Sequence, residues 1–402
     1  MSVYIYDAVR TPRGKGRPDG SLAAFTPAQL VGQLMRALER RNGPDAVRAA
    51  EHFTLGCVTQ VGGQGGHLAL ASRIQAGLPD AMACLTLNNF CVSGLSALAD
   101  AARRVSSGQV ELALAGGVES MSRVAFLSDQ ADYYADMALA GSMGWAPVGV
   151  AADLLATREG VTRPEMDAAV LRSHARAAEA WAAGRYDDRV IPAENPDGTV
   201  ALDRDENIRD FGDGASLARL GPVFAPPGAA GFDDIVLAQK PEIAAVQHLH
   251  TVAHCPPVSD GASLLLVGSR ETGERLGLTP LARIRSVAES ADDHVMQLTA
   301  GYRAMALALE RAGLALNDVG AVEFMEAFAA VPVLFERTFE PDMARVNPNG
   351  GHLAMGHPMG ATGAILATTL LDDMVQLDAD TGLVVATGGV GVGAAMVLER
   401  VT

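Results

Sequence analysis

The most constraining feature of this 402-residue sequence is a pattern that occurs twice, once in each half of the chain. After residue 91 a helix of small residues leads into QVELALAGGVES, and near the C-terminus ATGAILATTLLDDM leads into TGLVVATGGVGVG. Each copy indicates a helix, a turn and a buried strand, and we expect each strand to end in Gly-Gly-Val, at residues 116–118 and 388–390. Buried strands joined through helices are typical of parallel sheets with right-handed crossovers. The sequence therefore predicts an α/β protein built from two similar halves.

Residues 121–245 do not follow this pattern. RPEMDAAVLRSHARAAEAWAAGRY has the periodicity of an amphipathic helix, and a polar passage rich in glycine and proline follows it. We expect this segment to be an inserted loop domain. The N-terminal half would then comprise residues 1–120, completed by about 246–275, and the C-terminal half residues 276–402.

Composition limits the partners and the compartment. The formal net charge is -16 and no basic stripe interrupts it, so we expect no nucleic-acid partner. No apolar run approaches the roughly 18 residues of a membrane span, and the N-terminus lacks the pattern of a signal peptide. The four cysteines are irregularly spaced, which argues against disulfides and a structural zinc site. We therefore expect a cytoplasmic protein that holds no metal.

Cys91 lies between the polar run LNNF and a helix that we expect to begin at Ser93 or Gly94. A helix N-terminus exposes free N–H groups and carries the positive end of the helix dipole, which favours a thiolate. The functional interpretation is a reactive cysteine. The alternative is a buried structural cysteine, since free cysteine is among the most buried residue types.

The segment NPNGGHLAMGHPMGATGA packs several glycines around His352 and His357, and Pro358 fixes the chain after the second histidine. Glycines permit tight turns and close backbone approach, and a histidine held there can take a proton from a thiol. The alternative is a glycine-rich turn with a merely hydrogen-bonded histidine.

Several segments resemble the thiolase family, in the family's order. NNFCVSGLSAL resembles its nucleophile segment, GGHLAMGHPMGATGA its Gly-His-Pro segment, and VYIYDAVRTPRGKGRPDGSLA its N-terminal strand and loop. ALAGGVESMSR, SDGASLL, EAFAAV and GGVGVGAAMVLER also match, so the resemblance covers essentially the whole chain. It implies a thiolase fold, with duplicated halves in a five-layer αβαβα core and a loop domain that covers coenzyme A.

The resemblance also implies roles for single residues. Cys91 would be acylated by an acyl-CoA, and His357 would activate it. Backbone N–H groups at Cys91 and near Gly389 would stabilise the thioester oxyanion. Coenzyme A would be a substrate, and no other cofactor would be needed.

Two departures from the family pattern concern the enolate. Met325 stands where the family usually has an asparagine that orients a water in the oxyanion hole, and a thioether cannot donate a hydrogen bond. Thr387 stands where the family usually has the cysteine that acts as acid and base. A threonine hydroxyl is too weak an acid and base to replace that cysteine without help. His352 is one candidate for the missing base.

The ligand side departs as well. Gly221 occupies the usual arginine position of a Leu-Arg-Pro-Ala-Phe segment. His254 and Cys255, with the two prolines that follow, replace a small polar turn that usually lines the pocket. Either residue could be a substitute acid or base, or both could belong to a rearranged loop wall. We expect Arg185 or Arg189 to contact the phosphates of coenzyme A. We expect His248 and His250 to lie on the surface.

Three functions are compatible with these residues. The first is a thiolase-type acyltransferase that performs 3-ketoacyl-CoA thiolysis or Claisen condensation through an acyl-cysteine. The second is an acyltransferase or thioester hydrolase of the same fold without carbon-carbon chemistry, which both departures favour. The third is a non-catalytic partner subunit, against which the retention of Cys91 and His357 argues. The match over the whole chain favours the first, in a homodimer or homotetramer.

Overall fold

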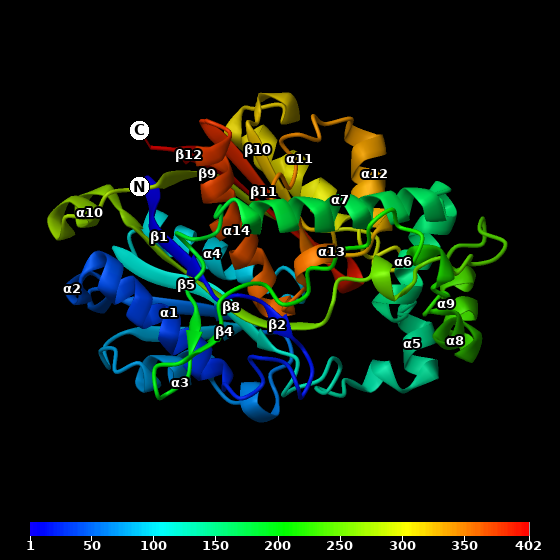
Figure 1. The fold of residues 1–402 in the computed structure, drawn as a ribbon, viewed down its shortest axis with the longest axis horizontal. Coiled ribbons are helices and arrows are strands. Elements are labelled where there is room, and N and C mark those ends of the chain that lie inside the picture. The colour runs from blue at the N-terminus through cyan, green and yellow to red at the C-terminus, as the bar shows by residue number, and fades with distance from the viewer. Residues whose placement is uncertain (402) are drawn as a thin grey trace.

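Ten strands form one mixed sheet in two parts in the computed structural model, which describes residues 1–401 (Figure 1). The N-terminal part has the order β4-β3-β5-β8-β1, and the C-terminal part has the order β9-β12-β11-β10. The two parts meet where Val3–Ile5 of β1 pair with residues 282–284 of β9. The short β2 pairs with β8, and β6 and β7 form a separate two-stranded sheet.

The elements of the N-terminal part are β1 (Val3–Arg10), β2 (Gly14–Lys15), α1 (Pro27–Asn42), α2 (Pro44–Arg48), β3 (His52–Gly56), α3 (Leu68–Gln75), β4 (Ala83–Leu87), α4 (Ser93–Ser106), β5 (Leu112–Ser120), β8 (Ser259–Ser269) and α10 (Arg270–Leu276). Those of the inserted segment are α5 (Met137–Met143), α6 (Val148–Glu159), α7 (Arg163–Ala182), β6 (Ala193–Glu194), β7 (Val200–Leu202), α8 (Ala225–Pro227) and α9 (Asp233–Gln239). Those of the C-terminal part are β9 (Ala282–Ala291), α11 (Ala300–Ala312), β10 (Ala321–Phe324), α12 (Ala330–Phe339), α13 (His352–Met355), α14 (Met359–Gln376), β11 (Thr381–Gly388) and β12 (Val392–Arg400).

The two parts repeat one strand arrangement. In the first, β1 pairs antiparallel with β8, β8 antiparallel with β5, and β5 parallel with β3. In the second, β9 pairs antiparallel with β12, β12 antiparallel with β11, and β11 parallel with β10. The predicted duplicated α/β architecture is therefore confirmed.

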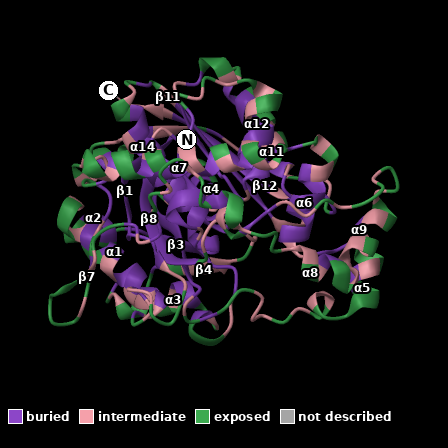
Figure 2. Ribbon diagram, turned by 45° about the vertical axis from the view of Figure 1, so that its right-hand side comes forward, coloured by how far each residue is buried: buried purple, intermediate pink, exposed green. Residues whose placement is uncertain are grey.

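Five layers result from the helices on either side of the two sheet parts. Helices α1 and α3 pack on the outer face of the N-terminal part, and α11 packs on the outer face of the C-terminal part. Helices α4 and α14 lie between the two parts and contact strands of both. Figure 2 shows α4 and the strands around it in the colour of buried residues. The αβαβα order expected from the resemblance is thus present.

One detail of the duplication is wrong. Strand β11 ends at Gly388 as expected, but β5 continues through Gly116 and Gly117 to Ser120. Gly117 does not form a turn; it lies within the strand, where the backbone of Gly360 packs against it. A Cβ on Gly117 would lie 2.0 Å from the carbonyl oxygen of Gly360. This glycine allows the start of α14 to rest directly on β5.

The two central helices cross at glycines. A Cβ on Gly363 of α14 would lie 2.4 Å from the backbone nitrogen of Leu95, and a Cβ on Gly94 of α4 would lie 2.7 Å from the backbone nitrogen of Ala364. Side chains at either position would separate the helices. Because Cys91 precedes α4 and His357 precedes α14, this crossing brings the two residues to the same place.

We expect Gly363→Ala to lower the free energy of unfolding by about 1–3 kcal/mol or more, since backbone cannot move aside as a side chain can. Gly32→Ala is the matched control, because Gly32 lies within α1 and the nearest atom to its Cβ would be a side-chain nitrogen of Arg36 at 3.5 Å. Helix propensity should make that change neutral or stabilising by up to about 1 kcal/mol. Equal effects of both changes in urea unfolding would contradict the close crossing.

The inserted segment contains α5 to α9. Helices α5, α6, α8 and α9 lie to the right of the core in Figure 1, α7 runs across the front, and β6 contacts α1. The helix predicted in this segment is confirmed as α7, which begins at Arg163 after a Thr162–Glu165 capping box. Figure 2 shows exposed and intermediate residues on α5, α8 and α9. The boundaries 1–120, 121–245 and 276–402 remain predictions.

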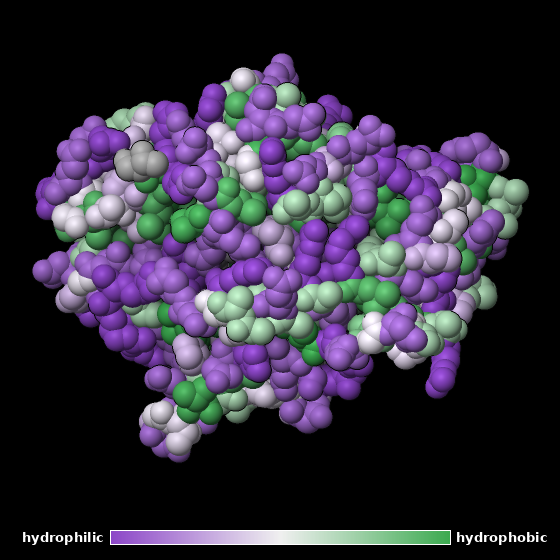
Figure 3. All heavy atoms as spheres, turned by 45° about the horizontal axis from the view of Figure 1, so that its top comes forward, coloured by the Kyte–Doolittle hydropathy of each residue, from purple (hydrophilic) through white to green (hydrophobic). Residues whose placement is uncertain are grey.

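The face of the molecule drawn in Figure 3 is mainly polar. On the face seen in Figure 3, apolar residues form scattered small groups among hydrophilic ones. Among residues 1–401 no single helix has the length and hydropathy of a membrane span; α5 and α6 reach them only as a pair, which is bent by 41°.

Candidate active site

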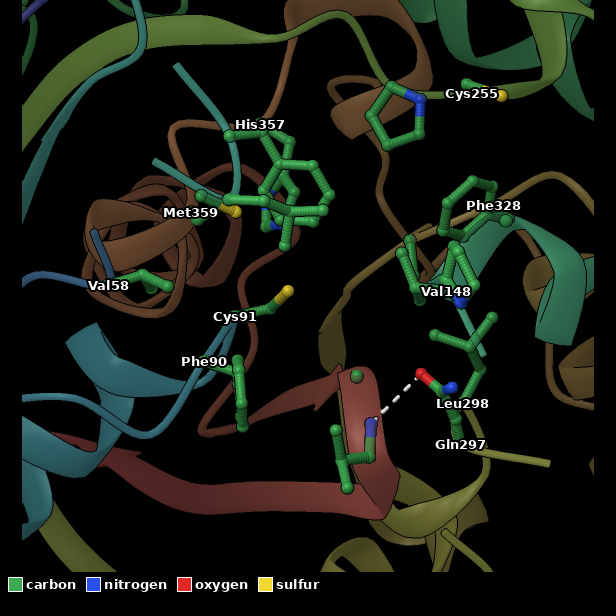
Figure 4. A pocket seen from close by; sticks show the side chains of 18 of the residues that line it. Val58, Phe90, Cys91, Val148, Cys255, Gln297, Leu298, Phe328, His357 and Met359 are labelled. Carbon is green, nitrogen blue, oxygen red and sulfur yellow. Dashed lines mark hydrogen bonds between the residues drawn. The ribbon is translucent and has the colours of Figure 1, made fainter. Parts of the chain in front are cut away.

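A cavity of about 290 Å³ lies between the loop domain and the ends of the central helices (Figure 4). Five residues singled out from the sequence line it, namely Cys91, Cys255, His357, Thr387 and Gly389. Most of the remaining wall is apolar and comes from Val58, Phe90, Met121, Phe126, Leu127, Tyr134, Trp145, Pro147, Val148, Phe224, Pro256, Val258, Leu298, Ala327, Phe328, Met359 and Val390. The cavity therefore excludes most water from the cysteine and suits an apolar ligand.

Cys91 occupies a tight turn between β4 and α4. Helix α4 begins at Ser93, as predicted. The Ser93 hydroxyl donates to the carbonyl oxygen of Phe90 at 2.6 Å and accepts from the backbone nitrogen of Asn89 at 2.8 Å, while Phe90 has a positive φ of 47°. This fixed turn directs the sulfur of Cys91 into the cavity (Figure 4).

His357 is held with one ring nitrogen available. Its backbone nitrogen donates to the carbonyl oxygen of Pro257 at 2.9 Å, and its Nδ1 lies 2.7 Å from the hydroxyl oxygen of Thr362. That hydroxyl already donates its proton to the carbonyl oxygen of Pro358 at 3.0 Å, so it accepts from Nδ1–H of His357. The tautomer follows: Nδ1 carries the proton, and Nε2 keeps a lone pair that can accept one.

Backbone donors surround the cysteine sulfur. The backbone N–H groups of Gly389 and of Cys91 itself lower the pKa of the Cys91 thiol, and both residues line the same cavity. Gly388 allows this approach, because a Cβ on it would lie 3.2 Å from the backbone nitrogen of Cys91. Two fixed N–H groups beside a nucleophile form the kind of donor pair that stabilises an oxyanion on an attacked carbonyl.

The expectation that this turn favours a thiolate is wrong for the free protein. Burial raises the pKa of the Cys91 thiol to about 11, and the Gly389 N–H only partly offsets it. Burial and the nearby Arg13 guanidinium lower the pKa of His357 to about 3. At neutral pH the pair is therefore a thiol beside a neutral imidazole, which can take the proton when the thiol attacks.

We expect alkylation of Cys91 by iodoacetamide to accelerate about tenfold per pH unit from pH 7 to pH 10, because the thiolate is the reactive form and its fraction rises up to a pKa of about 11. Peptide mapping would assign the label, with Cys91→Ala as the blank. A rate that levels off near pH 8 would show that the helix dipole outweighs burial.

Thr387 and Met325 differ in their relation to the cavity. Thr387, near the end of β11, lines it, is 2% exposed, and its hydroxyl oxygen has no hydrogen-bond partner within residues 1–401. Met325 directly follows β10 and is fully buried in the core, outside the cavity lining. Its backbone nitrogen donates to the carbonyl oxygen of Val385. Thr387 can therefore contact a ligand in the cavity, whereas Met325 lies in the core outside the lining.

The three remaining candidate acid/base residues do not face Cys91. His352 is buried behind His357 with ring centroids 5.7 Å apart, and neither of its ring nitrogens has a partner in the described chain. His254 accepts from the backbone nitrogen of Thr251 at Nδ1 and contacts Asp167 at 2.8 Å through Nε2. Cys255 lines the cavity, but its thiol donates to the carbonyl oxygen of Thr251, and burial raises its pKa to about 12.

The expectation of surface histidines at 248 and 250 is wrong. His250 is fully buried, with Nδ1 2.7 Å from Asp153, and His248 lies between Asp153 at 2.8 Å and Asp233 at 3.0 Å. The two carboxylates raise the pKa of His248. The reason is the buried carboxylate of Asp153 in α6, which draws both histidines inward. No cluster of potential metal ligands is found among residues 1–401.

Glu119 was missed by the sequence analysis although it organises the site. Its buried carboxylate accepts from the backbone nitrogens of Val58, Thr59 and Gly360, and from the amide of Gln64. One carboxylate thus joins a cavity-lining loop to the start of α14. A glutamate at the end of an apolar strand was the available signal.

A second hollow, of about 490 Å³, adjoins the cavity. The two share Cys255, Pro256 and Val258, and Lys15, Arg17 and Arg209 contribute positive charge to the second. No ion pair within residues 1–401 involves Arg17 or Arg209, and Lys15 lies 3.7 Å from Glu206. The hollow is therefore suited to an anionic group beside the apolar cavity.

The arginines expected to contact phosphates are occupied. Arg189 is buried, and its guanidinium contacts Asp372 at 2.6 Å. Arg185 contacts Glu179 at 2.8 Å and Asn349 at 3.2 Å. Both side chains join elements of the fold, which is why they are not free for a ligand.

A duplicated α/β core with a thiol and a neutral imidazole in one apolar cavity is suited to an acyl-transferring enzyme. The thiolase N-terminal domain matches residues 3–232 and the thiolase C-terminal domain matches residues 278–400. The chain belongs to the thiolase family and is a thiolase-type acyltransferase.

Similar proteins are 3-ketoacyl-CoA thiolases. That of Marinomonas sp. (strain MWYL1) is 36% identical over 99% of this chain and 98% of its own length. Those of Alcanivorax borkumensis and Escherichia coli O139:H28 are 35% and 34% identical over 99% of this chain and 98% and 99% of their own lengths.

Proposed function

We propose that this chain transfers acyl groups between 3-ketoacyl-CoA esters and coenzyme A through a thioester on Cys91. The observation that carries the proposal is the meeting of Cys91, the free Nε2 side of His357 and the Gly389 N–H in one apolar cavity. The relatives named above support the substrate class by their printed names. Coenzyme A is a substrate, and the steps below need no other cofactor.

The first step forms the acyl-enzyme. His357 Nε2 takes the proton of the Cys91 thiol as the sulfur attacks the 3-keto carbonyl, and the Gly389 and Cys91 N–H groups stabilise the oxyanion. The bond between the α-carbon and that carbonyl breaks, and the departing enolate of the shorter acyl-CoA takes up the proton held by His357, which becomes neutral again. The thiol of a second coenzyme A then attacks the thioester and releases the new acyl-CoA, and the proton it loses returns to Cys91.

The adjoining hollow supports coenzyme A as the carrier. Its thiol end must reach Cys91 in the apolar cavity, while its phosphates require cations. Lys15, Arg17 and Arg209 provide them in a protein whose formal net charge is -16. The two spaces share Cys255, Pro256 and Val258, and the ligand would pass along these residues, with its thiol end in the cavity and its phosphates in the hollow.

A thiolysis assay tests the proposed function. Acetoacetyl-CoA and a longer 3-ketoacyl-CoA are each mixed with coenzyme A and the enzyme, and loss of the 3-ketoacyl ester is followed by absorbance and mass spectrometry. Coenzyme A-dependent formation of two acyl-CoA products is expected. Hydrolysis or acyl transfer without cleavage between the carbons would contradict it.

The second candidate is acyl transfer or thioester hydrolysis without carbon-carbon chemistry. The unpaired hydroxyl of Thr387 favours it, because a threonine hydroxyl is too weak a base to take a proton from the α-carbon without help. Within the cavity, His357 is a proton acceptor with a free lone pair, whereas the Cys255 thiol is turned to a carbonyl. The enzyme would then load Cys91 but leave the α-carbon of acetyl-CoA untouched.

We expect Thr387→Cys to raise hydrogen-deuterium exchange at the α-carbon of acetyl-CoA by about 10²-fold or more if this second candidate holds, because it supplies a base in the cavity. Adding Met325→Asn tests the other departure, although it places an amide in the core. Nuclear magnetic resonance follows the exchange. Rapid exchange by the unmodified enzyme would exclude the second candidate in favour of thiolysis.

We also propose a homodimer or homotetramer in the cytoplasm. Strand β4 is at the end of the sheet, where its outer edge is free within residues 1–401, and such edges pair readily with another copy. The four cysteines are all free, which suits a reducing compartment. Light scattering on the purified protein tests the assembly.

A further inference from the structure

Gln297 has an unusual backbone and a fully engaged side chain. It is 1% exposed and has a φ of 59°, a backbone conformation that residues other than glycine rarely adopt. Such residues persist where the surroundings hold them, and they are frequent at functional sites. Gln297 lies in the loop before α11 and contributes to the wall of the cavity.

The Gln297 amide connects two segments that are far apart in the sequence. Its oxygen accepts from the backbone nitrogen of Val390 at 3.0 Å, drawn as the dashed line in Figure 4. Its nitrogen donates to the carbonyl oxygen of Ala146 at 2.9 Å, just before the cavity residues Pro147 and Val148. The amide thus joins the loop domain that covers the cavity to the turn after β11.

That turn needs external support. Val390 also has a positive φ of 59°, and Gly391 follows with a φ of 74°. The preceding residue, Gly389, is the one whose N–H lowers the pKa of the Cys91 thiol, and it lines the cavity together with Cys91. The Gly389 N–H belongs to the preceding peptide, so a rotation of the Gly389–Val390 peptide would move this N–H through the backbone angles of Gly389. The bond from the Val390 nitrogen to Gln297 opposes such a rotation, because breaking it would leave a polar group unpaired in an apolar wall.

We propose that Gln297 is a positioning residue for acyl transfer, which holds the Gly389–Val390 turn so that the Gly389 N–H faces Cys91 and ties this donor to the loop-domain cover. The inference rests on the proposed function, since its catalytic effect requires chemistry at Cys91. Gln297 itself takes no proton and forms no bond to the substrate. It acts by fixing a donor before charge develops, so that no reorganisation is needed during the reaction.

Two substitutions separate the hydrogen bonds from the backbone conformation. Gln297→Met keeps the length of the side chain but removes both hydrogen bonds. Gln297→Gly also removes them, and it adopts a positive φ without strain. Gln33→Met is the matched control, because Gln33 donates to the carbonyl oxygen and accepts from the backbone nitrogen of Glu194, far from the site.

The first readout is alkylation of Cys91 by iodoacetamide, which requires no acyl-CoA chemistry. Both Gln297 variants should react about threefold to tenfold more slowly at pH 8, because the thiolate loses its Gly389 donor. The pH profile should move to higher pH, a change that lower stability alone would not cause. Gln33→Met should react at the rate of the unmodified protein.

The second readout is steady-state thiolysis. For both Gln297 variants kcat should fall about 10- to 100-fold while KM changes by less than about twofold, as for loss of an interaction made in the transition state. Unchanged alkylation in both variants, or equal slowing in Gln33→Met, would overturn the proposal. If the unmodified enzyme shows no thiolysis, the proposed function fails, and the alkylation profile still decides whether Gln297 positions the turn.

Discussion

Replacing Cys91 by alanine is expected to reduce acyl transfer by about 10⁴ to 10⁶, the range found when a covalent nucleophile is removed. The physical reason is that the cavity then offers no other uncommitted thiol for the acyl group. Cys255 turns its thiol to the carbonyl oxygen of Thr251, and the burial of that thiol raises its pKa to about 12. Initial rates of coenzyme A-dependent turnover measure the effect.

Cys255→Ala serves as the control for this change, since it removes the second thiol of the cavity wall. A small loss on Cys91→Ala, together with a large loss on Cys255→Ala, would reverse the assignment of the nucleophile. Circular dichroism and thermal unfolding of both variants establish that the fold is retained.

We expect His357→Ala to slow acylation of Cys91 by about 10² to 10⁴, the usual contribution of a positioned acid or base. The free Nε2 of His357 is the lone pair that can accept the thiol proton, and the Thr362 hydroxyl fixes that tautomer. Rapid-quench measurement of acyl-enzyme formation isolates this step from later ones.

His352→Ala should have a much smaller effect on the same step, because this ring lies behind His357 and outside the cavity lining. Thr362→Val should fall between the two, since it removes the acceptor for Nδ1–H and leaves the imidazole in place. Equal losses for His352→Ala and His357→Ala, at unchanged stability, would mean that the histidine pair acts as one structural unit.

Most of the fold could be predicted because its signal is local and repeated. The helix after Cys91 and the strand that contains Gly116 and Gly117 recur as α14 and β11 near the C-terminus. Periodicity and glycine positions specify these elements without knowledge of distant contacts. The continuation of β5 to Ser120 could not be predicted, because it depends on the packing of Gly117 against Gly360.

The candidate site could be predicted in part. Cys91 and His357 each stand beside a helix start that the sequence marks, so their meeting follows once α4 and α14 cross. The raised pKa of Cys91 could not be predicted, because the segments that bury its thiol, the loop domain and the Gly389 turn, are far from Cys91 in the sequence. The orientation of His254 toward Asp167 and the role of Gln297 likewise depend on loops without a periodic pattern.

Intact-protein mass after brief incubation with an acyl-CoA tests the central claim most directly. The proposed acyl-cysteine predicts one added acyl group per chain, located at Cys91 by peptide mapping and discharged by coenzyme A. The same incubation should leave the Cys91→Ala protein unmodified. An adduct on Cys255, or a chain that stays unmodified while acyl-CoA is consumed, would contradict the account.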